Sequence, residues 1–306
     1  MRQRVIPALL ATVSLLAAPA SHAVLLELAL VIDGSGSIDG PNGNNPGPDW
    51  GLQMGSYQNI FEDNFYTNFV EPSNFTSVAV AAYIFSGGAS FTINSGGSAQ
   101  VFEYAVYSYI DWTEITNDAT AAAFGAQFAG IPQPGGSTDT QAALLTALNG
   151  GAVGCPIAEA CVPTAPLMPP FQNTVAGLLN NSYDGDALVI DISTDGVPTE
   201  PNGDGTPNTA DEALALAAAD EARANGVTVN AIGVGDQIGA DFLSALVGLD
   251  PAVDEFQGFF VTADGFDEFE ATLREKVRLE IIPVPAALPL FLSALGGLAF
   301  WRRRTT

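Results

Sequence analysis

A short oxygen-rich motif follows the first strongly apolar run of the mature chain. Residues 28–32 are all apolar, and the chain then reads Asp33-Gly-Ser35-Gly-Ser37, with one carboxylate and two hydroxyls at alternate positions. An unbroken apolar run predicts a strand buried on both faces, and glycines allow a tight turn at its carboxyl end. Carboxylate and hydroxyl oxygens gathered in one turn suit Mg²⁺, Ca²⁺ or Mn²⁺. The motif therefore predicts a cation-binding turn.

Two later turns carry the same kind of ligand. Gly136-Ser-Thr138-Asp-Thr140 precedes an expected helix, and Ser193-Thr-Asp195-Gly196 ends another apolar run. The carboxyl ends of parallel strands share one edge of a sheet, and open α/β folds bind their ligands there. We therefore expect the three turns to meet at one edge.

The three turns, in this order, resemble the metal-ion-dependent adhesion site (MIDAS) of the von Willebrand factor type A (VWA) domain. That site consists of Asp-x-Ser-x-Ser, a Thr after a Gly-rich turn and a later Asp-Gly, and the resemblance spans residues 25–279. It implies that Mg²⁺, or Mn²⁺ or Ca²⁺, is held directly or through water, and that an acidic group of a partner fills the free position. The implied metal ligands are Asp33, Ser35, Ser37, Thr138 and Asp195, with Thr140 as the alternative to Thr138.

The elements that must position these turns alternate between strands and helices. The expected strands cover residues 24–32, 77–85, 90–93, 101–109, 187–193, 227–234 and 258–262. The expected helices cover residues 50–70, 118–129, 141–148, 171–179, 210–224, 240–247 and 266–279. Uniformly apolar strands that alternate with helices predict an α/β fold, a doubly wound, mostly parallel sheet with helices on both faces. We expect one such domain, residues 24–281.

Both ends of the chain differ from this domain. Residues 1–23 combine Arg2 and Arg4, an apolar run and a final Ser-His-Ala23, which predicts a secretory signal peptide removed by signal peptidase. Residues 282–301 are apolar and precede three arginines, so they predict a transmembrane helix with its arginines in the cytoplasm.

The C-terminal residues 282–306 also resemble a PEP-CTERM sorting signal of the Val-Pro-Leu-Pro-Ala-like variant. The box reads Val284-Pro285-Ala286-Ala-Leu-Pro, a partial match that stands before the apolar helix and the arginine cluster. The resemblance implies recognition by an exosortase, removal of the tail, and a place in the cell envelope, at the surface or in the extracellular matrix of a Gram-negative bacterium. The alternative is a permanent membrane anchor.

Charge narrows the range of partners. All 34 acidic residues lie within residues 24–282, whereas only four of the nine basic residues do. A domain with a net charge near −30 repels nucleic acid and favours cations. The only histidine, His22, belongs to the predicted signal peptide, so no histidine-based catalytic triad or metal site is expected in the mature protein.

Two further features carry expectations of their own. Cys155 and Cys161 predict a disulfide that closes a small loop in an exported protein. Asp204, Asn208 and Asp211 offer oxygen ligands for a second cation site, although the stretch lacks the spacing of an EF-hand. The alternative is a solvated turn in which Thr209 caps the next helix.

These observations favour a binding protein over an enzyme. The main expectation is an exported adhesion module that acts through its cation on an unknown protein or glycan. The alternatives are a structural matrix protein whose metal stabilises the fold and a hydrolase that uses Asp33 and Asp195 for acid–base chemistry.

Overall fold

The computed structural model describes residues 24–39, 47–87, 90–95, 98–103, 106–151, 175–199, 209–235, 238–249 and 258–282. The domain is built on a six-stranded sheet in the order β5-β2-β1-β6-β7-β8. Its strands are β1 (Leu25–Asp33), β2 (Ser77–Phe85), β5 (Val106–Ile115), β6 (Ala187–Thr194), β7 (Val227–Val234) and β8 (Phe260–Ala263). All neighbouring pairs are parallel except β2 and β5. The doubly wound, mostly parallel α/β fold is therefore confirmed.

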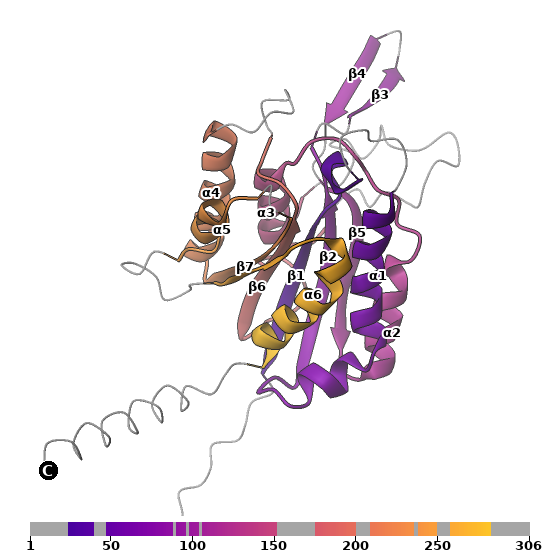
Figure 1. Ribbon diagram of the computed structural model, residues 1–306, viewed down its shortest axis with the longest axis vertical. Helices are drawn as coiled ribbons and strands as arrows, with labels where there is room; N and C mark the ends of the chain where they lie inside the picture. Colours follow the sequence, from indigo (N-terminus) through magenta and orange to yellow (C-terminus); the bar gives the residue numbers. More distant parts are fainter. Residues whose placement is uncertain are drawn as a thin grey trace, which may run out of the picture.

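Helices cover both faces of the sheet (Figure 1). One face carries α1 (Pro48–Glu62), α2 (Asp118–Gly125) and α6 (Phe266–Ile281). The other carries α3 (Thr140–Asn149), α4 (Thr209–Ala224) and α5 (Ala240–Leu246). Every residue of β2 is buried, because a strand between two helical layers exposes neither face. Short turns of other helical types cover Gly36–Asp39, Tyr66–Val70 and Ala126–Phe128.

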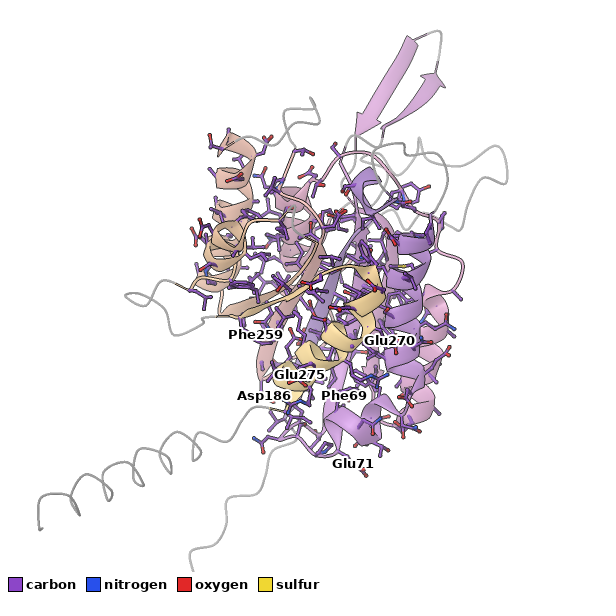
Figure 2. All side chains as sticks on the ribbon, in the orientation of Figure 1. Phe69, Glu71, Asp186, Phe259, Glu270 and Glu275 are labelled. Atoms are coloured by element: carbon purple, nitrogen blue, oxygen red, sulfur yellow. The ribbon has the colours of Figure 1, made fainter. Side chains whose placement is uncertain are left out.

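A two-stranded hairpin stands apart from this sheet. β3 (Ser90–Ser95) and β4 (Ser98–Glu103) pair only with each other among the described strands, in antiparallel register. Figure 1 shows the hairpin projecting from one end of the domain. Asp186 and Glu71 lie at the opposite end of the molecule (Figure 2). The sequence predicts a single strand over residues 101–109. That prediction is wrong, because β4 ends at Glu103 and a separate strand, β5, begins at Val106.

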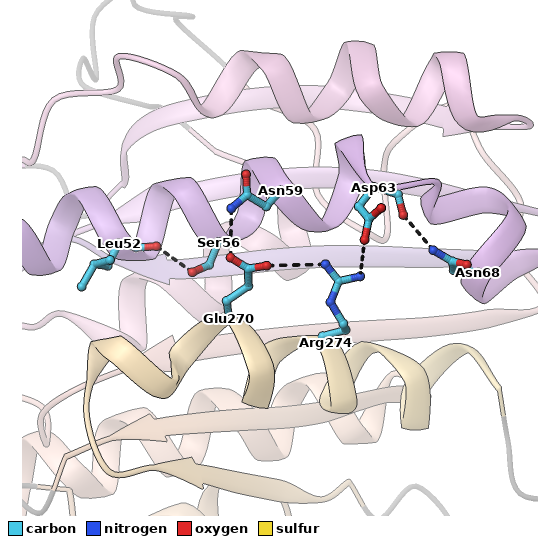
Figure 3. Close-up of polar contacts among 7 residues, drawn as sticks. All are labelled: Leu52, Ser56, Asn59, Asp63, Asn68, Glu270 and Arg274. Atoms are coloured by element: carbon cyan, nitrogen blue, oxygen red, sulfur yellow. Dashed lines mark hydrogen bonds and ion pairs between the residues drawn. The ribbon is translucent and has the colours of Figure 1, made fainter.

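Helices α1 and α6 are joined by polar contacts along their exposed side (Figure 3). The Asn59 amide donates to Glu270 at 2.9 Å, and Arg274 pairs with Asp63 at 3.1 Å and with Glu270 at 3.5 Å. Beneath these surface contacts, apolar side chains of both helices share one core with the sheet. Asn59 contacts Glu270, and four residues later in both helices Asp63 contacts Arg274, so the two helices run in the same direction along the sheet.

Farther along α6, a buried ion cluster replaces apolar packing. Lys276 is fully buried and pairs with Asp191 of β6 and with Glu280 one turn later. Burial works against the charge of Lys276, but the two carboxylates outweigh it and raise its pKa. Burial and the nearby Asp191 carboxylate raise the pKa of Glu280 to about 8. The cluster therefore carries little net charge at neutral pH when Glu280 is protonated.

Three other expectations about elements need correction. The expected helix 50–70 ends at Glu62, because Asn64 takes a left-handed conformation with a φ of 52° and a separate helical turn follows. The described part of the expected helix 171–179 contains no helix, since Val175 instead forms a bridge with Gly151. Thr209 does not precede α4 as a cap but is its first residue.

Several expectations fall outside the described residues. They are the signal peptide 1–23, the tail with Val284, Pro285 and Ala286, and the disulfide between Cys155 and Cys161. Among the helices that the structure describes, none is long and apolar enough to cross a membrane.

Candidate metal site

The two predicted aspartate ligands follow neighbouring strands at the centre of the sheet. Asp33 ends β1, and Asp195 comes directly after β6, which pairs with β1 up to Ile32 and Ser193. The connections reverse direction between these strands, since β2 and β5 lie on one side of β1 and β6, β7 and β8 on the other. Such a switch point leaves a crevice at the carboxyl edge, where α/β folds bind ligands.

Hydrogen bonds connect the oxygens of the first turn to Asp195. The Ser35 backbone N–H donates to Asp33 Oδ1 at 2.8 Å, and the hydroxyls of Ser35 and Ser37 lie 2.9 Å apart. The Ser37 hydroxyl donates to Asp195 Oδ1 at 2.7 Å. Asp33 and Ser35 are buried, whereas Ser37 is exposed. The site therefore has a closed floor and an open side.

The second turn brings Thr138 to the same place. A Cβ placed on Gly196 would lie 3.9 Å from Ser37 Oγ and 4.0 Å from Thr138 Oγ1, so both hydroxyls flank one point beside Asp195. Thr138 is only 4% exposed. The structure thus brings together hydroxyls and carboxylates from all three predicted turns.

Backbone hydrogen bonds hold the three turns together. Gly36 N–H donates to Gly136 O at 2.8 Å, and Gly135 N–H donates to Gly34 O at 2.9 Å. The third turn is attached to the second, because Thr199 N–H donates to Thr138 O and Thr138 N–H donates to Thr199 Oγ1, both at 3.0 Å. Backbone hydrogen bonds therefore fix the positions of the predicted ligands relative to one another.

Gly34 permits the close approach of the first two turns. A Cβ at this position would lie 2.6 Å from Cδ of Pro134 and 2.8 Å from its Cγ, so no larger residue fits without displacement of the second turn. The Gln133 amide donates to Ser35 O at 2.8 Å next to this contact. A glycine in the motif is thus required by packing as well as by the tightness of the turn.

The electrostatics of Asp33 favour a cation. Burial, with the Asp195 carboxylate next in effect, raises the pKa of Asp33 to about 7, although hydrogen bonds from Thr194 and Ser35 act in the opposite direction. All four basic side chains of residues 24–282 form ion pairs with other carboxylates. Two close carboxylates with three hydroxyls are a donor set that suits a hard divalent cation.

The site does not depend on a larger acidic cluster. Within the described part of the chain, no three His, Cys, Asp or Glu side chains gather closely enough to hold a metal. A cation at this site would therefore rest on two carboxylates, on hydroxyls and on water. Mg²⁺ commonly keeps several waters when it binds proteins in this way.

Sequence patterns did not identify the residues that support the ligands. The Thr194 hydroxyl donates to Asp33 Oδ2 at 2.7 Å, and the Gln53 amide of α1 donates to Asp33 O at 3.2 Å. The hydroxyls of Thr140 and Ser86 are buried and have no hydrogen-bond partner among the residues that the structure describes. Ser86 follows β2, whose last residue, Phe85, accepts a bond from the Gly34 N–H. Thr140 and Thr194 belong to the quoted motifs, so a sequence signal was available for them, whereas none pointed to Gln53 or Ser86.

Thr138 and Thr140, the two alternatives for the threonine ligand, differ in position. Thr138 lies beside Ser37, whereas Thr140 is the first residue of α3 and is fully buried. An unpartnered buried hydroxyl needs a polar neighbour, and a water of the cation's shell would provide one. The second cation site stays a prediction, because Asp204 and Asn208 lie outside the described residues; Asp211 is fully buried in the first turn of α4.

Comparison with known proteins gives one match to a family model and none to a curated protein. A family model described as a protein of unknown function (DUF1194) matches residues 170–285, which is less than half of the chain. A comparison with curated proteins gives no match.

Solved structures with a similar chain path include three of different origin. Proximal thread matrix protein 1 from the mussel byssus, with a zinc-occupied MIDAS motif, has a TM-score of 0.43 at 19% identity, over 85% of this chain and 46% of that chain. The pilus adhesin SpaC from Lactobacillus rhamnosus GG has a TM-score of 0.47 at 16% identity, over 85% of this chain and 31% of that chain. The SpRpn10 VWA domain has a TM-score of 0.41 at 14% identity, over 78% of this chain and 88% of that chain. The chain thus spans less than half the length of the first two.

Proposed function

We propose that the protein is an exported binding protein that holds a divalent cation at this site and uses it to bind an acidic group of a ligand. The observation that carries the proposal is the convergence of Ser37, Thr138 and Asp195 from three separate turns, the first of which also holds the buried Asp33. Asp33 and Asp195 would hold the cation directly or through water, and the serine and Thr138 hydroxyls would complete the protein's share of the shell.

The free coordination position determines the ligand chemistry. All four basic residues of the domain are engaged in ion pairs, so the domain offers no unpaired cationic side chain to an anionic ligand. A bound divalent cation would supply the local positive charge that the acidic surface lacks. Long-range repulsion by the net negative domain would then favour ligands that carry one accessible carboxylate on an otherwise weakly charged surface.

The first experiment tests whether the protein binds a divalent cation at the proposed site. Isothermal titration of the full chain with Mg²⁺, Mn²⁺ and Ca²⁺ should show one strong site, and the Asp33→Ala variant should lose it while it keeps its far-ultraviolet circular dichroism. Asp184→Ala is the matched control, because Asp184 is an exposed carboxylate outside the site. Unchanged cation binding in Asp33→Ala would refute the proposed site.

A second experiment separates ligand binding from stabilisation alone. The protein is applied to protein and glycan arrays with Mg²⁺ and with a chelator. Binding that needs the cation and disappears in Ser37→Ala supports adhesion. Binding that survives the chelator would assign ligand recognition to another surface.

One observation favours a structural matrix protein as the second candidate. The raised pKa of the buried Asp33 means that its ionised form is unfavourable without a cation, so metal binding would also stabilise the fold. A protein that gains stability from the cation but binds nothing on either array would fit this candidate.

A further inference from the structure

The projecting hairpin lies next to the cation site but takes no part in it. It continues directly from the end of β2, where Gly87 and Ser137 exchange backbone hydrogen bonds with each other. Its register pairs Phe91 with Phe102 and Ile93 with Gln100. A two-stranded hairpin is marginally stable by itself in water, so an extended one gains from a further strand.

The hairpin strands differ in charge from the rest of this acidic chain. No charged residue lies between Glu71 and Glu103, although the chain as a whole has a net charge of −25. Proline is also absent from residues 86–103. Charged residues and proline are the usual means by which exposed strand edges are kept from pairing with other chains. β3 has neither.

The sequence of β3 is complementary to itself. It alternates as Ser90-Phe-Thr-Ile-Asn94, with the small polar residues at even and the apolar residues at odd positions. In an antiparallel pair of β3 strands centred on Thr92, Phe91 lies opposite Ile93 and Ser90 lies opposite Asn94. Residues directly opposite each other share a face of the sheet, so this register keeps apolar with apolar residues. β4 is less suitable because it ends in Glu103.

The length of the hairpin reduces the electrostatic repulsion that would oppose association of two acidic domains. Two copies of this acidic domain repel each other when their bodies are in contact. A strand of six residues spans about 20 Å at ~3.3 Å per residue, which exceeds the Debye length of about 8 Å at physiological ionic strength. Because the hairpin projects from the domain (Figure 1), pairing at β3 keeps the two bodies apart.

We propose that the hairpin is a self-association element, in which β3 pairs antiparallel with β3 of a second copy of this chain around Thr92. The result is a symmetric four-stranded sheet, β4-β3-β3-β4, that joins two domains. The same surface patch serves on both copies, as a two-fold dimer requires. The proposal does not depend on the cation, because no predicted metal ligand belongs to the hairpin.

Charge placed at the centre of this pairing tests it. The full chain and its Thr92→Glu, Thr92→Lys and Thr92→Gln variants are compared by sedimentation equilibrium at about 0.05 M and about 1 M NaCl. The original chain should dimerise, more tightly at high salt because repulsion between the bodies is screened. Thr92→Glu should raise the dissociation constant about fivefold at low salt, since like charges then lie opposite each other. Thr92→Gln, a matched uncharged change, should leave it unchanged.

The mixture of two charged variants gives the decisive result. An equimolar mixture of Thr92→Glu and Thr92→Lys should associate more tightly at low salt than either variant alone, because opposite charges then meet at the two-fold axis. This restoration cannot come from a hairpin that merely fails to form. A monomeric original chain at both salt concentrations, or a mixture that associates no better than its components, would overturn the proposal.

Discussion

Ser37 and Asp195 lie 158 residues apart in the chain and share a hydrogen bond of 2.7 Å between Oγ and Oδ1. This bond joins the turn after β1 to the turn after β6 at the open side of the site. Both atoms are predicted cation ligands, so a bound cation would replace or share this contact. The Ser37 hydroxyl is consequently the most direct probe of the site.

Removal of that hydroxyl should weaken cation binding without unfolding the protein. Ser37 is exposed, so Ser37→Ala should alter the free energy of unfolding of the cation-free protein little. The loss of one oxygen ligand should reduce cation affinity by at least about tenfold, measured by isothermal titration. Ser182→Ala, a change at another exposed serine, is the control. Equal affinities for the two variants would remove Ser37 from the shell.

Cation binding should release a proton from Asp33. Its pKa in the cation-free protein is about 7, so a cation that requires the carboxylate displaces about 0.9 proton at pH 6 and about half a proton at pH 7. Titrations in buffers of different ionisation enthalpy measure this number. Affinity should fall as the pH is lowered below 7, and Asp33→Asn should abolish the proton release. Cation binding without proton release at pH 6 would contradict this assignment.

The same shift has the opposite effect on the cation-free protein. The pKa of Asp33 is raised above its ordinary value of 3.8, so the stability that its protonated form provides is present at about pH 4 and is lost as the pH rises through 7. Urea unfolding of cation-free protein and of Asp33→Asn, compared at pH 5 and pH 8, should give a larger loss of stability for the original chain. Parallel losses in both proteins would assign the pH dependence to other groups.

The two turns should not tolerate a side chain at Gly34. Gly34→Ala places a methyl group 2.6 Å from Cδ of Pro134, so we expect a loss of about 1–3 kcal/mol in unfolding free energy and weaker cation binding. Gly51 of α1 is the matched control, because a Cβ there meets nothing within 4 Å. Gly51→Ala should stabilise the protein by about 0.5–1 kcal/mol, since alanine favours helix. A neutral Gly34→Ala would mean that the turns adjust freely.

The buried lysine of α6 should be essential for stability. Lys276→Met leaves Asp191 buried without its cationic partner, and loss of one partner of a buried pair costs about 3–5 kcal/mol. Arg278→Met on the same helix removes an exposed pair with Glu275 and should have little effect. Urea denaturation of both variants makes the comparison. Similar losses for the two would show that the buried pair contributes no more than the surface pair.

The central strands were predictable because they are apolar on both faces. The expected spans 77–85 and 227–234 coincide with β2 and β7. Burial between two helical layers leaves β2 apolar throughout after Ser77, and β7 mostly apolar apart from Thr228 and Asn230. The edge strand β5 was misplaced, because a half-exposed strand mixes polar and aromatic residues. The end of α1 was missed for a related reason. Phe65 and Phe69 continue the apolar spacing past Asn64, where the backbone has already left the helix.

The ligand types were predictable, but their support was not. Asp33, Ser35 and Ser37 follow one another in a local motif, so their proximity needs no tertiary information. Gln53 and Thr199 reach the site only through the fold, Gln53 from the buried side of α1 and Thr199 from a polar loop. No local pattern separates these two residues from other polar residues of the chain.

The direction of α6 places residue 282 at the same end of the domain as residue 24. β8 ends at the same sheet edge as the candidate cation site, and α6 then returns along α1, with Glu270 beside Asn59 and Arg274 beside Asp63 (Figure 3). Residue 282 therefore leaves the domain at the edge where β1 begins, and residue 24 lies there too, bonded to Thr76. A tether at either point would aim the cation site and the hairpin outward, away from whatever surface holds the protein.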